Sequence, residues 1–182
     1  MKNAYYIISS LPSLKWGGNP PMSSEEFLAL CSSYLSDSEM EELKSASITP
    51  RNEKVHMSNS LAFLWHDHET FLRNRIAKIR GKGKSLTENR AREEKGFYAV
   101  AEKIAHTALA NENPLEKEKI LDLHRWKIIE DLSALHQFDF DAIVAYKLKL
   151  QLLEKSSSMN RELGLENLNK IKENILKKQE LS

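Results

Sequence analysis

The chain has 182 residues, 29% of them charged, and its 27 Lys and Arg balance 26 Asp and Glu, which excludes a strong overall field for nucleic acid or an anionic membrane. Its one cysteine excludes an internal disulfide framework and suits a reducing cytosol. No run reaches the roughly 18–20 apolar residues of a membrane span, and the few Gly and Pro residues favour helix.

The N-terminal part predicts short helices around a loop. Residues 4–11 carry β-branched and aromatic side chains that fit either a short strand or a first helix. The stretch "GGNPP" then forces a loop. Two capping boxes follow, each with a serine three residues before a glutamate: Ser23 with Glu26, and Ser36 with Glu39. Each box predicts the start of a helix.

Two long amphipathic helices are expected next. The first begins at Leu61, runs for about five turns and ends at "RGKGKS". Its apolar face consists of Leu61, Leu64, Trp65, His68, Leu72, Ile76 and Ile79. Ser85 and Glu88 form a third capping box before the second helix. The face of that helix consists of Phe97, Val100, Ala101, Ile104, Ala108 and Leu109.

Asn113 and Pro114 predict another helix start, as N-cap and first helical residue. Its main apolar stripe consists of Leu121, Ile128, Leu132 and Leu135. Asn160 is the expected cap of a final helix. The sequence therefore predicts an all-α, irregular multi-helix bundle of about six or seven helices. We expect a single helical domain over residues 1–182. Its N-terminal helices lie in residues 23–112 and its C-terminal helices in residues 113–182, which form either part of the same body or a sub-domain.

The segment "FDFDAIVAYKLKLQLLEK", residues 138–155, combines two patterns. "YKLKLQL" alternates apolar and polar residues, as a half-buried strand does. On a helical wheel, however, the polar residues Lys147, Gln151, Glu154 and Lys155 gather in one arc of about 100°. Only Lys149 falls outside that arc. We therefore predict a helix with a narrow solvated stripe.

A helix that is apolar over most of its girth must be covered on several sides. It either lies at the centre of the core or contacts another chain with part of its surface, because large exposed apolar areas usually mark interfaces. The candidate partner interface consists of Tyr146, Lys149, Leu150 and Leu153.

No catalytic, cofactor-binding or metal site is expected. His66 and His68 lie about 200° apart around a helix, and His66 with Glu69 supplies only two metal ligands. A buried, hydrogen-bonded His68 is the simpler interpretation. Cys31 lies among apolar residues and is expected to be a buried, inert thiol. We expect no enzyme and no cofactor.

A basic run gives the alternative function, nucleic-acid binding by residues 73–84. The run has no intervening acid and consists of Arg73, Arg75, Lys78, Arg80, Lys82 and Lys84. No aromatic residue is interleaved to stack bases, and cations also favour a helix C-terminus. The final Gly-Lys-Ser lacks the strand and the first glycine of a phosphate loop. Nucleic acid is therefore not the expected partner.

Four stretches carry a family resemblance: "YYIISSLPSL", "PPMSSEEFLALC", "NPLEKEKILDLHRWKIIEDL" and "FDFDAIVAYKLKLQLLEK". As a set they resemble a small bacterial family whose genes tend to lie within V-type ATPase operons. That family is distantly similar to the C subunit of V-type ATPases, named d in eukaryotes, an all-helical funnel between the membrane rotor ring and the central stalk. The run from Asp141 to Leu148 carries this second similarity. The chain is shorter than that funnel protein, so a complete funnel is not implied.

The resemblance implies a non-catalytic subunit or assembly factor of a rotary ATPase that transports protons or sodium ions. Such a protein couples the central stalk to the rotor and has no ATP site. Its partners are V-type ATPase subunits, and it has no small-molecule substrate. It lies in the cytoplasm and meets the inner face of the membrane only through the complex.

Overall fold

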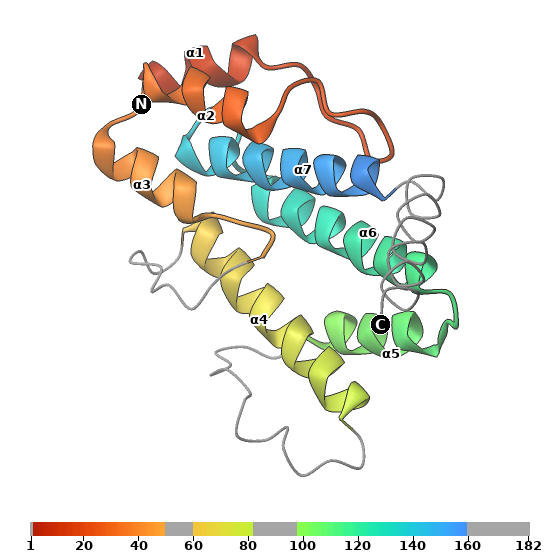
Figure 1. Cartoon of the computed structure of the whole chain (residues 1–182). Coiled ribbons are helices and arrows are strands. Elements are labelled where there is room, and N and C mark those ends of the chain that lie inside the picture. The colour runs from red at the N-terminus through yellow and green to blue at the C-terminus, as the bar shows by residue number, and fades with distance from the viewer. Residues whose placement is uncertain (1, 50–59, 82–97, 160–182) are drawn as a thin grey trace, which may run out of the picture.

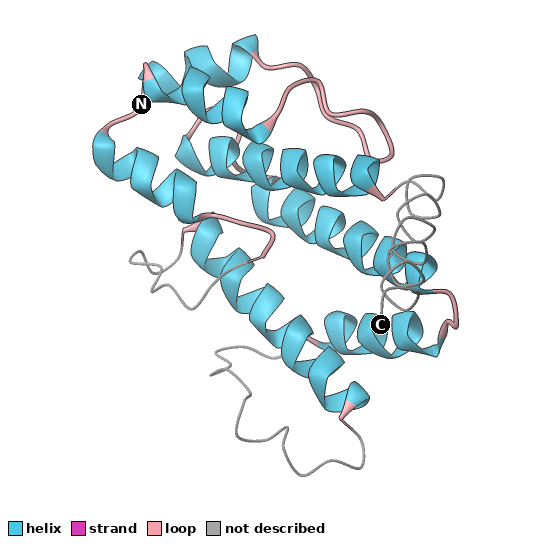
Figure 2. Cartoon of the chain, in the orientation of Figure 1, coloured by secondary structure: helices cyan, strands magenta, loops and turns pink. Residues whose placement is uncertain are grey.

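The computed structural model describes residues 2–49, 60–81 and 98–159, which form seven helices and no strand (Figures 1 and 2). The helices are α1 (Lys2–Ser10), α2 (Ser24–Ser32), α3 (Asp37–Ser45), α4 (Leu61–Arg80), α5 (Ala99–Ala110), α6 (Pro114–Ser133) and α7 (Phe140–Ser158). The predicted all-α fold is confirmed. The strand alternative for residues 4–11 is wrong, because these residues lie in α1 and the turn after it.

The helix starts follow the capping residues. Ser23 and Ser36 lie in extended backbone before α2 and α3, and both predicted capping boxes are formed. The Asn113 side chain accepts a hydrogen bond from the Leu115 N–H, with Pro114 as the first residue of α6. α4 ends before Gly81, as predicted. The predicted caps at residues 85 and 160 lie outside the described residues.

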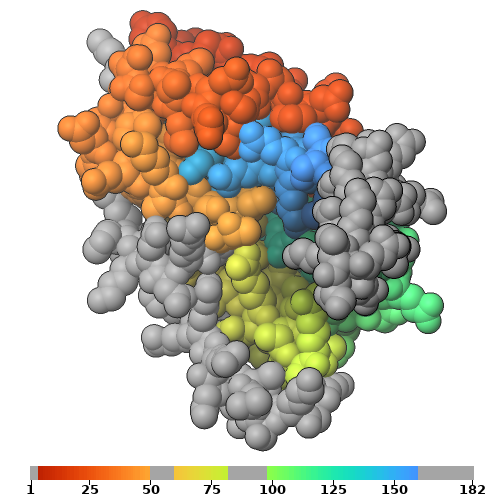
Figure 3. Space-filling view, in the orientation of Figure 1, coloured from red at the N-terminus to blue at the C-terminus, as the bar shows by residue number. Residues whose placement is uncertain are grey.

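Helix α7 is the centre of the fold. It contacts α1, α2, α3, α4 and α6 (Figure 1), and Figure 3 shows the N-terminal helices, in red to orange, against the blue α7. Its apolar side chains are buried with Phe27, Leu43 and Trp65 in the larger of two hydrophobic clusters. The helical interpretation of "YKLKLQL" is therefore confirmed. α7 contacts helices from both sides of the expected division after residue 112.

The polar stripe of α7 is only partly solvated: Gln151, Glu154 and Lys155 are half-buried, and the expectation of a solvated stripe is wrong for Lys147. Lys147 is only 2% exposed. Its Nζ donates hydrogen bonds to the carbonyl oxygens of Leu43, Lys44 and Ala46, at 2.5, 3.1 and 2.7 Å. These carbonyls belong to the C-terminal turn of α3, where a helix lacks internal donors and favours a cation. Burial lowers the pKa of Lys147 to about 8, so the amine is still protonated at pH 7.

The rest of the stripe also binds neighbouring elements. The Gln151 side-chain oxygen accepts a hydrogen bond from the Ile48 N–H at 3.1 Å. The Glu154 carboxylate accepts from the N–H and hydroxyl of Ser24, the first residue of α2, at 2.6 and 2.5 Å. A helical wheel separates polar from apolar positions but does not distinguish water from the polar ends of neighbouring helices. The stripe thus fastens α7 to α2, α3 and the chain after α3.

A buried ion network lies between the two hydrophobic clusters. The smaller cluster joins α4, α5 and α6 around Phe71, Leu72 and Leu121. Glu69 on α4 is fully buried beside it and accepts hydrogen bonds from Arg125 Nε and Nη2, both at 2.9 Å, and from Arg73 Nε at 2.7 Å. The two charged partners thus satisfy a carboxylate that would otherwise be costly to bury.

Arg125 on α6 extends this network toward α7. Its Nη1 donates to the Asp122 carboxylate at 2.7 Å. Lys155 on α7 donates to Asp122 at 2.8 Å and to Glu118 at 2.9 Å. Burial lowers the pKa of Arg125, but its ion pairs and hydrogen bonds with Glu69 and Asp122 have a larger effect, so the pKa is raised overall. The network therefore joins α4, α6 and α7 by charge-assisted hydrogen bonds.

Three residues expected on apolar faces are exposed, one of them Leu64 on α4, which is 37% exposed. α6 ends at Ser133, so Leu135 lies in the turn before α7 and is 93% exposed. Val100 at the start of α5 is 63% exposed, whereas Ala101, Ala105 and Ala108 face the core. Phe97, expected on the same face, lies outside the described residues.

Candidate protein interface

Exposed aromatic side chains gather where α1 meets the α6–α7 turn. Tyr5 and Tyr6 on α1 are 51% and 63% exposed, and Phe138 in the turn is 48% exposed. The ring centroids of Tyr5 and Phe138 lie 5.0 Å apart, and those of Tyr5 and Tyr6 lie 5.9 Å apart. We call Tyr5, Tyr6 and Phe138 the aromatic patch. Sequence reasoning missed it, although "YY" and "FDF" stand outside the predicted core faces.

A groove of about 260 Å³ lies next to the aromatic patch. One wall is the end of α1 and the loop after it, residues 8–14, and the other is the α6–α7 turn with the first half of α7. Leu11 and Leu14 contribute apolar surface, while His136 and Lys149 contribute polar groups. We call it the α7 groove. An apolar groove beside exposed aromatic rings can accept a helix or loop of another protein.

Tyr146, expected at a partner interface, lines the α7 groove. Its ring stacks on Phe27 at a centroid distance of 5.1 Å, and its hydroxyl donates to the Pro12 carbonyl oxygen at 3.0 Å. Burial raises its pKa, so it remains a neutral donor at physiological pH. Tyr146 thus fixes the loop after α1 and shapes the groove wall.

Lys149, the misplaced cation of the helical wheel, also lines the groove. Its side chain is 20% exposed and its Nζ lies 3.7 Å from a Glu130 carboxylate oxygen and 5.2 Å from the centre of the Trp126 ring. Burial lowers the pKa of Lys149, and Glu130 partly opposes this effect. The side chain of Lys149 therefore lines the groove, while its charged end lies beside Glu130 and Trp126 on α6.

Leu150 and Leu153 do not lie at an accessible surface, and this part of the expected interface is wrong. They are 0% and 1% exposed, inside the larger hydrophobic cluster. The wheel placed them on the apolar side of α7, but several helices cover that side. Of the four expected interface residues, only Tyr146 and Lys149 border the groove.

His136 adds a polar ring to the rim of the α7 groove. Its Nδ1 lies 2.6 Å from an Asp139 carboxylate oxygen and 3.7 Å from Asp141. The hydrogen bond to Asp139 is the main reason that the pKa of His136 is raised. Asp139 is also the N-cap of α7, and Asp141 accepts a hydrogen bond from the Leu61 N–H. These contacts fix the turn that carries Phe138.

Of the other residues considered for chemistry, His68 and Cys31 are core residues, whereas His66 is half-buried. His68 is 3% exposed and packs against Tyr98 and His124, and its Nδ1 has no hydrogen-bond partner among residues 2–49, 60–81 and 98–159. Within those ranges no three His, Cys, Asp or Glu side chains gather closely enough to hold a metal ion. Cys31 is fully buried, and burial raises its pKa to about 11.

The basic run is divided by the fold. Arg73 binds Glu69 and, at 3.2 Å, the Ile48 carbonyl oxygen, while Arg75 lies 4.4 Å from the centre of the Phe71 ring. Lys78 and Arg80 are exposed. Residues 82 and 84 lie outside the described part of the chain.

Comparison with known protein families gives a match for the C-terminal part of the chain. Residues 100–179 match the model of a family described as "Protein of unknown function (DUF2764)". The match includes α6, α7 and the groove residues Tyr146 and Lys149. No curated protein and no solved structure matches the chain. No helix in the described ranges has the length and apolar character needed to cross a membrane. The C-terminal part of the chain is therefore similar to a family of unknown function, and a link to the V-type ATPase stays a prediction.

Proposed function

We propose that this protein is a non-catalytic subunit or assembly factor of a bacterial V-type ATPase, and that it docks onto a stalk or rotor protein of that complex through the aromatic patch and the α7 groove. The family resemblance supplies the identity of the partner. The observation that carries the docking surface is the cluster of Tyr5, Tyr6 and Phe138, each about half exposed or more.

The composition of this surface supports a protein partner. Aromatic residues are enriched at protein interfaces because they bury a large area and lose little conformational entropy. Tyr and Phe rings also pack edge to face with the rings of a partner. Tyr146 and Asp139 fix the two walls, so the surface is largely formed before binding. A pre-formed surface loses less free energy on association.

Affinity purification from the cells that make the protein tests this function. The tagged full chain should recover V-type ATPase subunits under mild conditions. The double variant Tyr5→Ser/Phe138→Ser should recover at least about tenfold less, since loss of two buried aromatic contacts costs more than about 1.4 kcal/mol. Val100→Ser is a matched control, because Val100 is 63% exposed on α5, at the opposite end of the fold from α1 (Figure 1).

Three results decide the proposal. Recovery that falls with the patch variant and not with Val100→Ser supports it. Equal recovery by all three proteins contradicts the patch as the docking surface. If the unaltered chain recovers no component of the ATPase, the partner itself is wrong.

The alternative, nucleic-acid binding through residues 73–84, has less support. Arg73 directs its guanidinium to Glu69 and Ile48, and Arg75 stacks on Phe71. Nucleic-acid binding requires a row of cations that faces successive phosphates, and its affinity falls steeply with salt. Absence of salt-dependent binding to single- and double-stranded probes would remove this alternative.

A further inference from the structure

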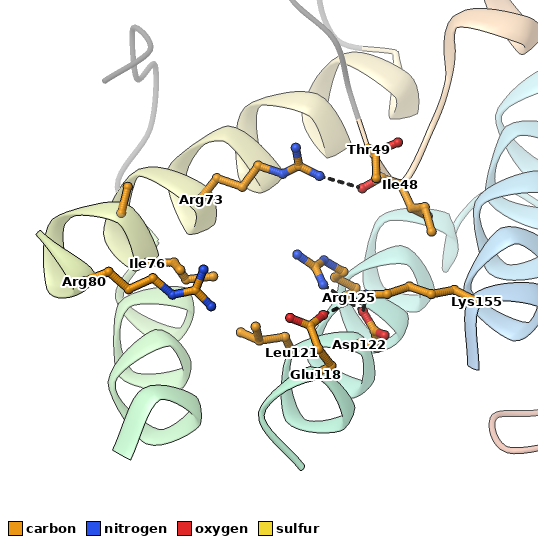
Figure 4. A pocket seen from close by; sticks show the side chains of 11 residues that line it. Ile48, Thr49, Arg73, Ile76, Arg80, Glu118, Leu121, Asp122, Arg125 and Lys155 are labelled. Carbon is orange, nitrogen blue, oxygen red and sulfur yellow. Dashed lines mark hydrogen bonds and ion pairs between the residues drawn. The ribbon is translucent and has the colours of Figure 1, made fainter. Parts of the chain in front are cut away.

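A second cavity, of about 460 Å³, lies on a different part of the molecule from the α7 groove. It opens between the C-terminal half of α4, the N-terminal half of α6, the end of α7 and residues 48–49. Figure 4 shows the guanidinium groups of Arg73, Arg80 and Arg125 around this space, with Lys155 on α7. We call it the arginine pocket. Its volume lies within the range of about 300–1,000 Å³ that is usual for small-molecule sites.

The charges of the arginine pocket do not cancel. Four cationic side chains line it, against the carboxylates of Glu118 and Asp122. Glu69, which contacts Arg73 and Arg125 from the core, brings the carboxylates to three. One positive charge is left in excess. Burial raises the pKa of Glu118, but Lys155, Arg125 and Arg80 have the larger effect and lower it overall. Glu118 is therefore ionised and is included among the three carboxylates.

Several donors in the pocket are available to a ligand. Within the described ranges no hydrogen bond or ion pair uses the guanidinium of Arg80, although its charge helps to lower the pKa of Glu118. The hydrogen bonds of Arg73 use Nε and Nη2 and leave Nη1, and Lys155 uses two of its three N–H groups. Arg73 and Lys155 side chains are also 34% and 26% exposed, so these donors are accessible.

Apolar side chains form the remaining wall. Ile76 and Ala77 on α4 line the pocket, and so does Leu121 on α6, which lies beside Glu118 and Asp122 (Figure 4). Convergent polar groups beside apolar surface are typical of sites that orient a small organic ligand. Two guanidinium groups and an ammonium supply more donors than one carboxylate accepts, whereas a phosphate presents three oxygens and up to two charges.

We propose that the arginine pocket binds a small organic phosphate, whose phosphate is held by Arg73, Arg80 and Lys155 and whose less polar body lies against Ile76 and Leu121. The buried pairs of Glu69 with Arg125 and of Arg125 with Asp122 hold the site in shape. Binding joins α4 to α7 and tightens the junction between the two hydrophobic clusters. This site does not depend on an ATPase partner.

Calorimetric titration of the full chain at constant ionic strength tests the proposal with three probes: phenyl phosphate, inorganic phosphate and benzoate. Phenyl phosphate should bind saturably, and at least about tenfold more tightly than inorganic phosphate, because only it fills the apolar side. Benzoate should bind at least about tenfold more weakly than phenyl phosphate, because it accepts fewer charge-assisted hydrogen bonds.

Two exposed basic residues on α4 give a matched pair of variants. Arg80→Gln should weaken phenyl phosphate binding at least about fivefold, whereas Lys78→Gln, which does not line the pocket, should leave it unchanged. Neither side chain belongs to the buried network, so both variants should keep the thermal stability of the unliganded protein. Equal losses in both variants, no saturable binding of phenyl phosphate, or benzoate binding as tightly as phenyl phosphate would each overturn the proposal.

Discussion

Replacing Glu69 by leucine tests how the buried ion network stabilises the fold. Glu69 is fully buried and accepts three hydrogen bonds from Arg73 and Arg125. Arg73 is 34% exposed at its side chain and can turn to water, but Arg125 is only 8% exposed and cannot. Glu69→Leu therefore leaves a buried guanidinium with Asp122 as its only carboxylate partner in the described chain.

The magnitude follows from this asymmetry. Breaking a buried ion pair by removing one partner costs about 3–5 kcal/mol, and Glu69→Leu should fall in that range. Arg125→Met should lower the free energy of unfolding less, by about 1–3 kcal/mol. In this variant Glu69 is still hydrogen-bonded to Arg73, and Asp122 is still hydrogen-bonded to Lys155. The double variant Glu69→Leu/Arg125→Met should be no less stable than Glu69→Leu alone, because it also removes the buried guanidinium that has lost its Glu69 partner. The coupling free energy between the two sites should then reach at least about 1 kcal/mol.

Guanidinium chloride unfolding of the four proteins, followed by circular dichroism, gives these values. Lys119→Met is the control, because Lys119 and Glu116 form an exposed pair at 2.8 Å that should contribute less than about 1 kcal/mol. Additive losses in the double variant, or a loss below about 1 kcal/mol for Glu69→Leu, would refute the reasoning.

Three further predictions concern other buried polar groups. Burial lowers the pKa of His68 from 6.5 to about 4, so the folded state opposes protonation of this imidazole. The neutral imidazole should contribute up to about 3 kcal/mol to the free energy of unfolding above pH 6.5, and this contribution should be lost as the pH falls toward 4. In acid unfolding curves, His68→Gln should therefore lose less stability than the unaltered protein between these pH values. Lys147→Met should lower the free energy of unfolding by about 1–3 kcal/mol in urea unfolding at pH 7, because three carbonyl oxygens at the end of α3 lose their donor; an unchanged midpoint would contradict this assignment. Cys31, with its pKa raised to about 11 by burial, should react with a thiol reagent only after unfolding in guanidinium chloride, and rapid reaction of the native protein would contradict its placement.

Local signals in the sequence predict most of the helices. The capping boxes at Ser23 and Ser36 and the Asn113-Pro114 start depend on neighbours within three residues, so they are readable without the fold. Residues 4–11 are ambiguous in the sequence because β-branched and aromatic residues fit both strand and helix. The structure places most of these residues in α1, which packs against α7 through long-range contacts that the local sequence does not reveal.

The candidate sites depend on contacts that no periodicity reveals. Glu69 and Arg125 are 56 residues apart, and the Lys147 bond to Leu43 spans 104 residues. A wheel assigns such side chains to a polar face but does not name what they meet. Leu150 and Leu153 show the same limit for apolar residues. An apolar helix face predicts that its side chains are buried, but it does not predict whether helices of this chain or of another chain bury them. Only Tyr146 and Lys149 of the expected interface border the groove.

Purification of the intact V-type ATPase from the cells that make this protein tests the central claim most directly. We predict that the chain co-purifies with V-type ATPase subunits, with the intact complex if it is a subunit and with a partly assembled complex if it is an assembly factor, and that Tyr5→Ser/Phe138→Ser releases it. Absence of the chain from the complex at every stage of purification, together with unchanged ATP-driven ion transport after deletion of its gene, would contradict the proposed function.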